Sequence, residues 1–163
     1  MKRSAKILLF CISSLALISW DRARKELAKE HLKGKEAVSY FHDTFRLQYV
    51  ENTGAALSMG DSLPKAASFW LLSILPLAFL LAMIGYVINR SNEIGTAKFI
   101  AFALIIAGGL GNIYDRIVFD RHVTDFMNMG IGSLRTGIFN FADMFITAGA
   151  IVLLLSYKKS STA

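Results

Sequence analysis

The sequence predicts an α-helical membrane protein with four transmembrane helices, a small β-cradle and a surface amphipathic helix in its first extracytoplasmic loop. Two observations carry this prediction. Of the 163 residues, 54% are hydrophobic and 18% are charged, whereas soluble domains carry about 25% charged residues. The apolar residues are also gathered into blocks, and a block of about 20 apolar residues is long enough to cross a bilayer.

Four blocks are expected to form the transmembrane helices: residues 5–20, 66–88, 97–114 and 138–157. The first is short, although the stem of Lys6 can extend along the lipid and lengthen it. A cleaved signal peptide is the alternative for this block, and it is disfavoured because Ser19-Trp20-Asp21 offers no small-x-small cleavage pattern. Four spans give a single polytopic domain, residues 1–163, with both termini on one side and extracytoplasmic loops at 21–65 and 115–137.

The first loop is expected to carry secondary structure of its own. Residues 22–32 are rich in helix-forming residues with charges throughout, which predicts a helix lying near the membrane surface. Residues 44–50 alternate apolar and polar side chains, which is typical of a strand with one apolar face. Asn52-Thr53-Gly54 then predicts a turn. A small sheet resting on the bilayer follows from this pattern.

The net charge of +6 indicates lipid rather than nucleic acid as the partner of the basic residues. These residues flank the apolar blocks and form no basic patch interleaved with aromatic residues. Counting basic residues on each side does not assign the termini to the cytoplasm, because many of them fall in the first loop. Cys11 is the single cysteine, which excludes an intramolecular disulfide and a thiolate cluster. The three histidines lack ligand spacing, so no metal or cofactor is expected.

Polar residues at the edges of apolar spans are costly in lipid and are therefore candidate functional residues. One group lies at the end of the third span and contains Asn112, Asp115 and Arg116; a second is centred on Asp125, and a third contains Asn140 and Asp143. Structural alternatives remain open for each group. The glycines at 108 and 111 favour close helix packing, and the residues of the other two groups are suited to a turn or a helix N-cap.

Asp125 and Asp143 flank one loop, so they can converge from two segments. Two carboxyl groups held close together share one proton, because both cannot ionise easily. The ionised group can then activate water while the protonated group polarises a peptide carbonyl, which is the chemistry of an aspartic protease. The sequence offers no His-Glu-x-x-His or Gly-x-Ser-x-Gly motif as an alternative.

Two other functions use membrane aspartates. A prepilin-type peptidase requires Gly-x-Gly-Asp, whereas this chain has Gly-Leu-Gly-Asn at residues 109–112. A small proton-coupled transporter or carrier subunit would relay ions through the same carboxylates, but the chain has no internal repeat of the kind such proteins use.

Five motifs occur in a characteristic order. They are Asp21-x3-Lys25, residues 50–56 (Val-Glu-Asn-Thr-Gly-Ala-Ala), residues 111–116 (Gly-Asn-Ile-Tyr-Asp-Arg), residues 123–126 (Val-Thr-Asp-Phe) and residues 139–143 (Phe-Asn-Phe-Ala-Asp). In this order, and placed against four spans, they resemble the lipoprotein signal peptidases (signal peptidase II) over nearly the whole chain. Arg22, Leu57 and Met144 depart from the usual family pattern, and none of these departures removes a carboxylate.

The resemblance implies an endopeptidase that cleaves diacylglyceryl-modified prolipoproteins just before the lipidated cysteine. It implies a location in the bacterial cytoplasmic (inner) membrane, with cytoplasmic termini, an active site near the outer face, contact with membrane lipid and inhibition by globomycin-like peptides. Asp125 and Asp143 are then the catalytic dyad. Further residues are implied to bind substrate (Asn52, Gly54, Asn112, Arg116 and Asn140) or to support the structure (Asp21, Lys25 and Asp115). The glycine-rich residues 126–138 suggest a mobile loop that gates substrate entry.

Overall fold

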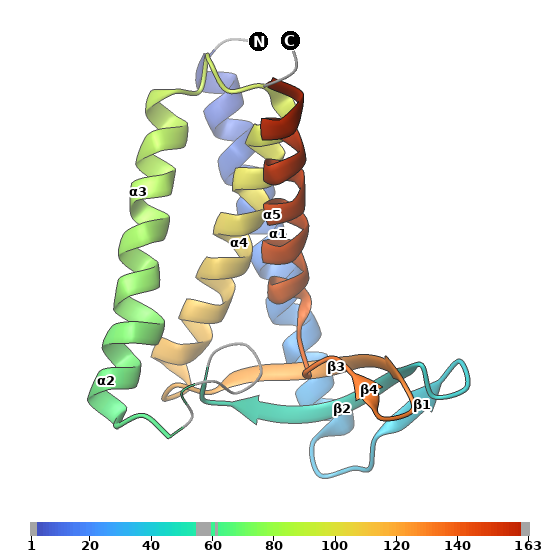
Figure 1. The fold of residues 1–163 in the computed structure, drawn as a ribbon. Coiled ribbons are helices and arrows are strands. Elements are labelled where there is room, and N and C mark those ends of the chain that lie inside the picture. Colours follow the sequence, from blue (N-terminus) through green and yellow to red (C-terminus); the bar gives the residue numbers. More distant parts are fainter. Residues whose placement is uncertain (1–2, 55–59, 61, 161–163) are drawn as a thin grey trace.

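The computed structural model describes residues 3–54, 60 and 62–160. Its elements are the helices α1 (Arg3–Leu32), α2 (Lys65–Phe69), η2 (Trp70–Ile74, a π-helix), α3 (Leu75–Asn89), α4 (Thr96–Val118) and α5 (Phe141–Ser160), and the strands β1 (Val38–Tyr40), β2 (Phe45–Asn52), β3 (Val123–Ile131) and β4 (Leu134–Arg135). The long helices stand side by side, and the sheet lies across one end of them (Figure 1). The start of α1 and the end of α5 lie at the opposite end.

Within the described part of the chain, three helical segments are long and apolar enough to cross a membrane: Arg3–Leu32, Lys65–Asn89 and Thr96–Val118. Residues 141–157 form a shorter apolar helix. The first three expected spans fall inside these segments, whereas the last helix begins at Phe141 rather than at residue 138. The delay has a local cause, because Phe139 pairs with Met127 of β3 as an isolated β-bridge. The combination of apolar helices and a small antiparallel sheet matches the predicted fold class.

The sheet is antiparallel, with the strand order β1-β2-β3-β4. The expected strand at residues 44–50 corresponds to β2, which pairs with β3 so that Val50 lies opposite Asp125 and Asn52 opposite Val123. A register shift interrupts this pairing between Leu47 and Val50. The sheet therefore joins the chain after α1 to the chain after α4 and places Asn52 beside Asp125.

The structure corrects the placement of the surface helix. Residues 22–32 are helical as expected, but they continue α1 without a break and do not form a separate helix along the membrane surface. No glycine or proline interrupts the helix there. Asp21 and Lys25 are both 1% exposed and form an i, i+4 ion pair, so burial against the rest of the fold keeps this turn helical.

The segment between α4 and α5 is also more ordered than expected. Helix α4 continues to Val118, and Asp125 lies within strand β3 rather than in a loop. Residues 126–138, expected to form a mobile gate, contain most of β3 and all of β4. Gly130 is needed for close approach there: a Cβ atom at this position would lie 2.4 Å from the Leu134 carbonyl oxygen. This glycine therefore serves strand packing and not flexibility.

Helix α4 packs closely against α5, which carries Asp143. A Cβ atom on Gly108 would lie 2.3 Å from the carbonyl oxygen of Ala142, and one on Gly149 would lie 2.7 Å from that of Ala101. Small residues allow two helix backbones to approach closely in a membrane. These contacts hold α5 against α4, and the first of them brings the first turn of α5 close to the polar residues in the last two turns of α4.

Candidate active site

Asp125 lies on β3 and is 3% exposed. The Nδ2 atom of Asn52, on the neighbouring strand, donates a hydrogen bond of 2.9 Å to its Oδ2 atom. The Oδ1 atom of Asn52 in turn accepts a 2.9 Å hydrogen bond from the backbone N–H of Gly54. The turn expected at residues 52–54 thus orients the amide that contacts Asp125.

Asn140 and Asp143 form a reciprocal cap at the start of α5. The Asn140 Oδ1 atom accepts from the Asp143 N–H at 3.0 Å, and Asp143 Oδ2 accepts from the Asn140 N–H at 3.0 Å. Such paired contacts satisfy two donors that the first turn leaves without partners. The N-cap interpretation is therefore correct, and it does not exclude a role in a site. The cap leaves the Asn140 Nδ2 atom facing Asp125 Oδ1 at 2.6 Å.

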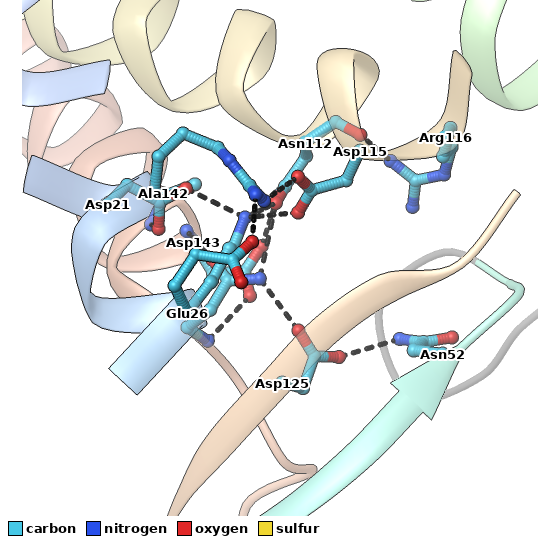
Figure 2. A network of polar contacts seen from close by, with 12 residues as sticks. Asp21, Glu26, Asn52, Asn112, Asp115, Arg116, Asp125, Ala142 and Asp143 are labelled. Atoms are coloured by element: carbon cyan, nitrogen blue, oxygen red, sulfur yellow. Dashed lines mark hydrogen bonds and ion pairs between the residues drawn. The ribbon is translucent and has the colours of Figure 1, made fainter. Parts of the chain in front are cut away.

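The two carboxylates are therefore linked through one residue. Asn140 donates to Asp125 with its side chain and to Asp143 with its backbone. Asn112 of α4 adds a second link, since its Nδ2 donates to Asp143 Oδ1 at 2.8 Å and its Oδ1 accepts from Asn140 Nδ2 at 3.1 Å. Figure 2 shows Asp125 on its strand facing the network that contains Asn112 and Asp143.

Burial raises the pKa of Asp125 to about 6. Hydrogen bonds from Asn52 and Asn140 act in the opposite direction, and the nearby charge of Asp143 adds to the increase. A carboxyl group in a desolvated place beside another carboxylate is the arrangement expected of a proton-sharing pair. Perturbed acids of this kind occur most often at functional sites.

A buried ionic cluster lies behind the two carboxylates. Lys25 Nζ lies 2.7 Å from Asp21 Oδ2 and 2.8 Å from Asp115 Oδ2. Asp21 Oδ1 accepts a 2.9 Å hydrogen bond from the backbone N–H of Ala142, in the first turn of α5. The residues expected to support the structure thus hold α1, α4 and α5 together next to Asp143.

Sequence reasoning missed the part played by Arg22, which it treated as a departure from a family pattern. Its Nη1 atom lies 2.5 Å from Asp115 Oδ1, and its guanidinium lies over the rings of Tyr114 and Phe119. The i, i+4 spacing of Arg22 and Glu26 was a visible signal of a local ion pair. The partner 93 positions away left no such signal.

Arg116 ties the chain after β2 to α4. Its Nη2 atom donates to the Gly54 carbonyl oxygen at 2.8 Å, and its Nη1 atom makes a longer contact of 3.4 Å with the Asn112 carbonyl oxygen. The Arg116 Nε atom is buried without a hydrogen-bond partner among the described residues. The remainder of the motif, Ala55 and Ala56, and the departure at Leu57 lie outside the described residues.

A cavity of ≈ 900 Å³ opens beside the two carboxylates. Its polar end is lined by Asn52, Asn112, Arg116, Asp125 and Asp143, and its apolar part by residues of α3, α4 and α5 that include Phe79, Leu80, Ile105, Ile146 and Ile151. Asn140 is fully buried and acts on this cavity through its neighbours. Across the described part of the chain, no group of three or more His, Cys, Asp or Glu residues is placed to hold a metal ion.

The protein has apolar helices of membrane-spanning length, a sheet at one end of them and buried carboxylates between the helices and the sheet. These features define a multi-pass membrane protein. Two solved bacterial membrane enzymes, determined by the in meso method at 2.3 and 1.9 Å resolution, share this fold. Their TM-scores are 0.80 and 0.75, at 23% identity in both cases. The alignments cover 95% of this chain and 90% of the first structure, and 93% of both chains for the second.

A family model described as signal peptidase (SPase) II matches residues 13–158. A lipoprotein signal peptidase from Chlorobaculum tepidum is 34% identical over 163 residues, covering 94% of this chain and 96% of that protein. Another from Borrelia duttonii is 32% identical over 144 residues, covering 85% of this chain and 83% of that protein. The chain therefore belongs to the signal peptidase II family, and membership indicates a membrane protease that acts on signal peptides.

Proposed function

We propose that this protein cleaves the signal peptide from diacylglyceryl-modified prolipoproteins just before the lipidated cysteine, with Asp125 and Asp143 as its catalytic dyad. The observation that carries the proposal is the placement of these two carboxylates. Both line the polar end of an otherwise apolar cavity, and both are hydrogen bonded to Asn140. A lipid-modified substrate needs such a combination of an apolar binding surface and a polar reaction centre.

The dyad divides the work of hydrolysis between its two members. We assign the shared proton to Asp125, because burial raises its pKa and a bound substrate would bury it further; in this form Asp125 donates a hydrogen bond to the carbonyl oxygen of the scissile peptide. Asp143 accepts a proton from water as the water oxygen attacks the carbonyl carbon. The tetrahedral intermediate then collapses, the C–N bond breaks, and the leaving nitrogen takes up a proton from the dyad. No metal or cofactor takes part in these steps.

The walls of the cavity determine the class of substrate. Side chains from α3, α4 and α5 form its apolar part, which suits the hydrophobic segment of a signal peptide and the acyl chains of the modified cysteine. Asn52 and Arg116 at the polar end are placed to hydrogen bond the backbone near the scissile bond, and Gly54 holds both of them through its N–H and carbonyl groups.

The orientation in the membrane follows from the substrate. Lipoprotein precursors are processed at the outer face of the bacterial cytoplasmic membrane, so the sheet end of the bundle faces outward and both termini are cytoplasmic. Lys6 contacts the Ser91 carbonyl oxygen, so the start of α1 lies at the same end of the bundle as the turn between α3 and α4. A globomycin-like peptide inhibitor is expected to occupy the same cavity.

The first test is cleavage of a purified diacylglyceryl-modified prolipoprotein by the protein in detergent or lipid. Asp125→Asn and Asp143→Asn should each lower turnover by about 10³-fold or more, because members of one catalytic unit cannot replace each other. Asp120→Asn is the matched control: Asp120 is exposed and pairs with Lys65 away from the cavity. Full turnover in either dyad variant, or no cleavage by the unchanged protein, would contradict the proposal.

A further inference from the structure

Lys25 is a buried cation with three polar neighbours within 3 Å. Its side chain is 1% exposed. The Nζ atom contacts Asp21 Oδ2 at 2.7 Å, Asp115 Oδ2 at 2.8 Å and Asn112 Oδ1 at 2.9 Å. An ammonium group has three donors and no acceptor. The three partners come from α1 and α4 and fix the position of the Nζ atom, with one donor directed at the Asn112 amide.

The contact with Lys25 determines which way the Asn112 amide faces. Because an ammonium can only donate, it must meet the oxygen end of that amide. The nitrogen end then lies toward Asp143, where Nδ2 donates to Oδ1 at 2.8 Å. Rotating the amide by 180° would place nitrogen against nitrogen at Lys25 and oxygen against oxygen at Asp143.

Asn140 supports the same orientation with a weaker contact. Its own amide is fixed by the helix cap, and its Nδ2 donates to Asn112 Oδ1 at 3.1 Å. Hydrogen bonds from a charged donor are roughly twice as strong as neutral ones, and the Lys25 contact is also the shorter of the two. Lys25 therefore has the larger influence on the Asn112 amide.

We infer that Lys25 is a positioning residue of the dyad: it keeps an N–H donor of Asn112, and not its carbonyl oxygen, directed at Asp143. This inference rests on the proposed function for its effect on turnover. Asp143 must accept a proton from water in that reaction, and a carbonyl oxygen facing it would repel its charged form. Lys25 does not line the cavity, and its hydrogen bond to Asn112 is the contact that leads directly to Asp143.

Lys25→Met tests the inference, with Arg22→Gln as the matched control. Both changes remove a positive charge that pairs with Asp115, but only Lys25 contacts Asn112. Lys25→Met should lower kcat about 10- to 100-fold, as expected for loss of a group that orients a directly acting one, and leave KM within about twofold. Arg22→Gln should have nearly the same kcat as the unchanged protein.

A double-mutant cycle separates positioning from general support of the fold. Asn112→Leu removes the amide through which Lys25 is proposed to act, so adding Lys25→Met should then lower kcat by less than about twofold more. Multiplicative losses in the double variant would overturn the inference. If Lys25→Met does not fold in detergent, the same cycle is carried out in protein that also carries Asp21→Asn. Removing this buried negative charge compensates for the loss of the positive charge of Lys25.

A spectroscopic measurement is independent of turnover. In protein labelled with ¹⁵N-asparagine, the side-chain amide signals of Asn112 are identified by their loss in Asn112→Leu. These signals should shift in Lys25→Met and stay in place in Arg22→Gln. Unchanged signals in Lys25→Met would also overturn the inference. A protein that shows the shift but cleaves no lipoprotein would contradict the proposed function and leave the inferred orientation standing.

Discussion

Asp125 is the residue whose ionisation can be followed directly. Its pKa of about 6 arises chiefly from burial, and the ordinary value is 3.8. The infrared band of the protonated Asp125 carboxyl group should disappear as the pH rises, with a midpoint near pH 6 in the wild-type protein. The same band should be absent in Asp125→Asn. Asn52→Ala removes a hydrogen bond that lowers this pKa, so its midpoint should be higher. A midpoint near 4 in the wild-type protein would contradict the assignment.

The same shift has a consequence for stability. Because folding raises the pKa of Asp125, the folded state holds this proton more tightly than the unfolded state does. The stabilisation is therefore complete below pH 3.8 and is lost as the pH rises through about 6. Other carboxylates, such as Asp120 with its lowered pKa, oppose this trend at lower pH, so the comparison must be made against Asp125→Asn.

Asn140 combines a structural and a positioning role that substitutions can separate. Serine caps a helix as well as asparagine does, so Asn140→Ser should keep the cap and lose the contacts with Asp125 and Asn112. Turnover should fall about tenfold, on the scale of one lost hydrogen bond to a charged group, with little change in Tm. Asn140→Ala should in addition lower stability by about 1 kcal/mol. Equal Tm losses in both variants would show that the amide is mainly structural.

At the residue scale, sequence reasoning found the dyad candidates and their polar neighbours because each lies in a short, dense motif at a span edge. It could not find how they connect. Lys25 and Asn112 are 87 positions apart, and no local pattern indicates a contact at that separation. The same limit explains why Asp125 was expected in a loop. Its strand is stabilised by pairing with β2, which the local sequence does not show.

At the scale of elements, the packing of α4 on α5 depends on glycine. Gly108→Ala would place a Cβ atom 2.3 Å from the Ala142 carbonyl oxygen, so α5 must move away from α4. Overpacking of this kind costs about 1–3 kcal/mol, and the movement also displaces Asp143. We expect a lower Tm in detergent together with lower turnover.

Gly85→Ala is the control for that substitution. Gly85 lies within α3, and apart from the adjacent backbone of its own helix a Cβ atom there would meet nothing within 4 Å. Alanine favours helix over glycine by about 1 kcal/mol, so Tm should be unchanged or higher. Equal losses at both glycines would indicate a general sensitivity to substitution and not a tight α4–α5 contact.

Element positions were largely predictable from the apolar blocks, and their ends were not. The α1 helix continues past its apolar block because Asp21 and Lys25 are buried by α4 and α5. The charged residues at 22–32 led to the prediction of a separate helix on the membrane surface. In the structure these residues are the last turns of α1, which packs in the bundle. An apolar block in the sequence indicates only the part of a helix that lies in the lipid. Where the helix ends depends on its contacts with other elements, which the block does not show.

At the scale of the whole molecule, the tips of the sheet present an apolar surface. Phe41, Ile131 and Leu134 are 77%, 78% and 84% exposed. The turn at Phe41 has three successive positive φ angles, from Phe41 to Asp43, and the Ser39 hydroxyl and Arg135 guanidinium hold it through Asp43. The sheet crosses one end of the helices and its β1–β2 turn projects past them (Figure 1). Exposed apolar residues on such a turn are expected to lie in lipid.

This expectation leads to a prediction about depth in the bilayer. An environment-sensitive fluorophore on Phe41→Cys or Leu134→Cys, in a Cys11→Ser background, should shift to the blue in vesicles and be quenched by brominated lipids. Glu36→Cys is the control, because the loop between α1 and β1 lies on the side of the sheet away from the helices (Figure 1). Its fluorophore should remain in water. Equal quenching at all three positions would mean that the whole sheet lies in water or that the whole sheet lies in lipid. Either result would contradict a sheet that contacts the bilayer only through its tips.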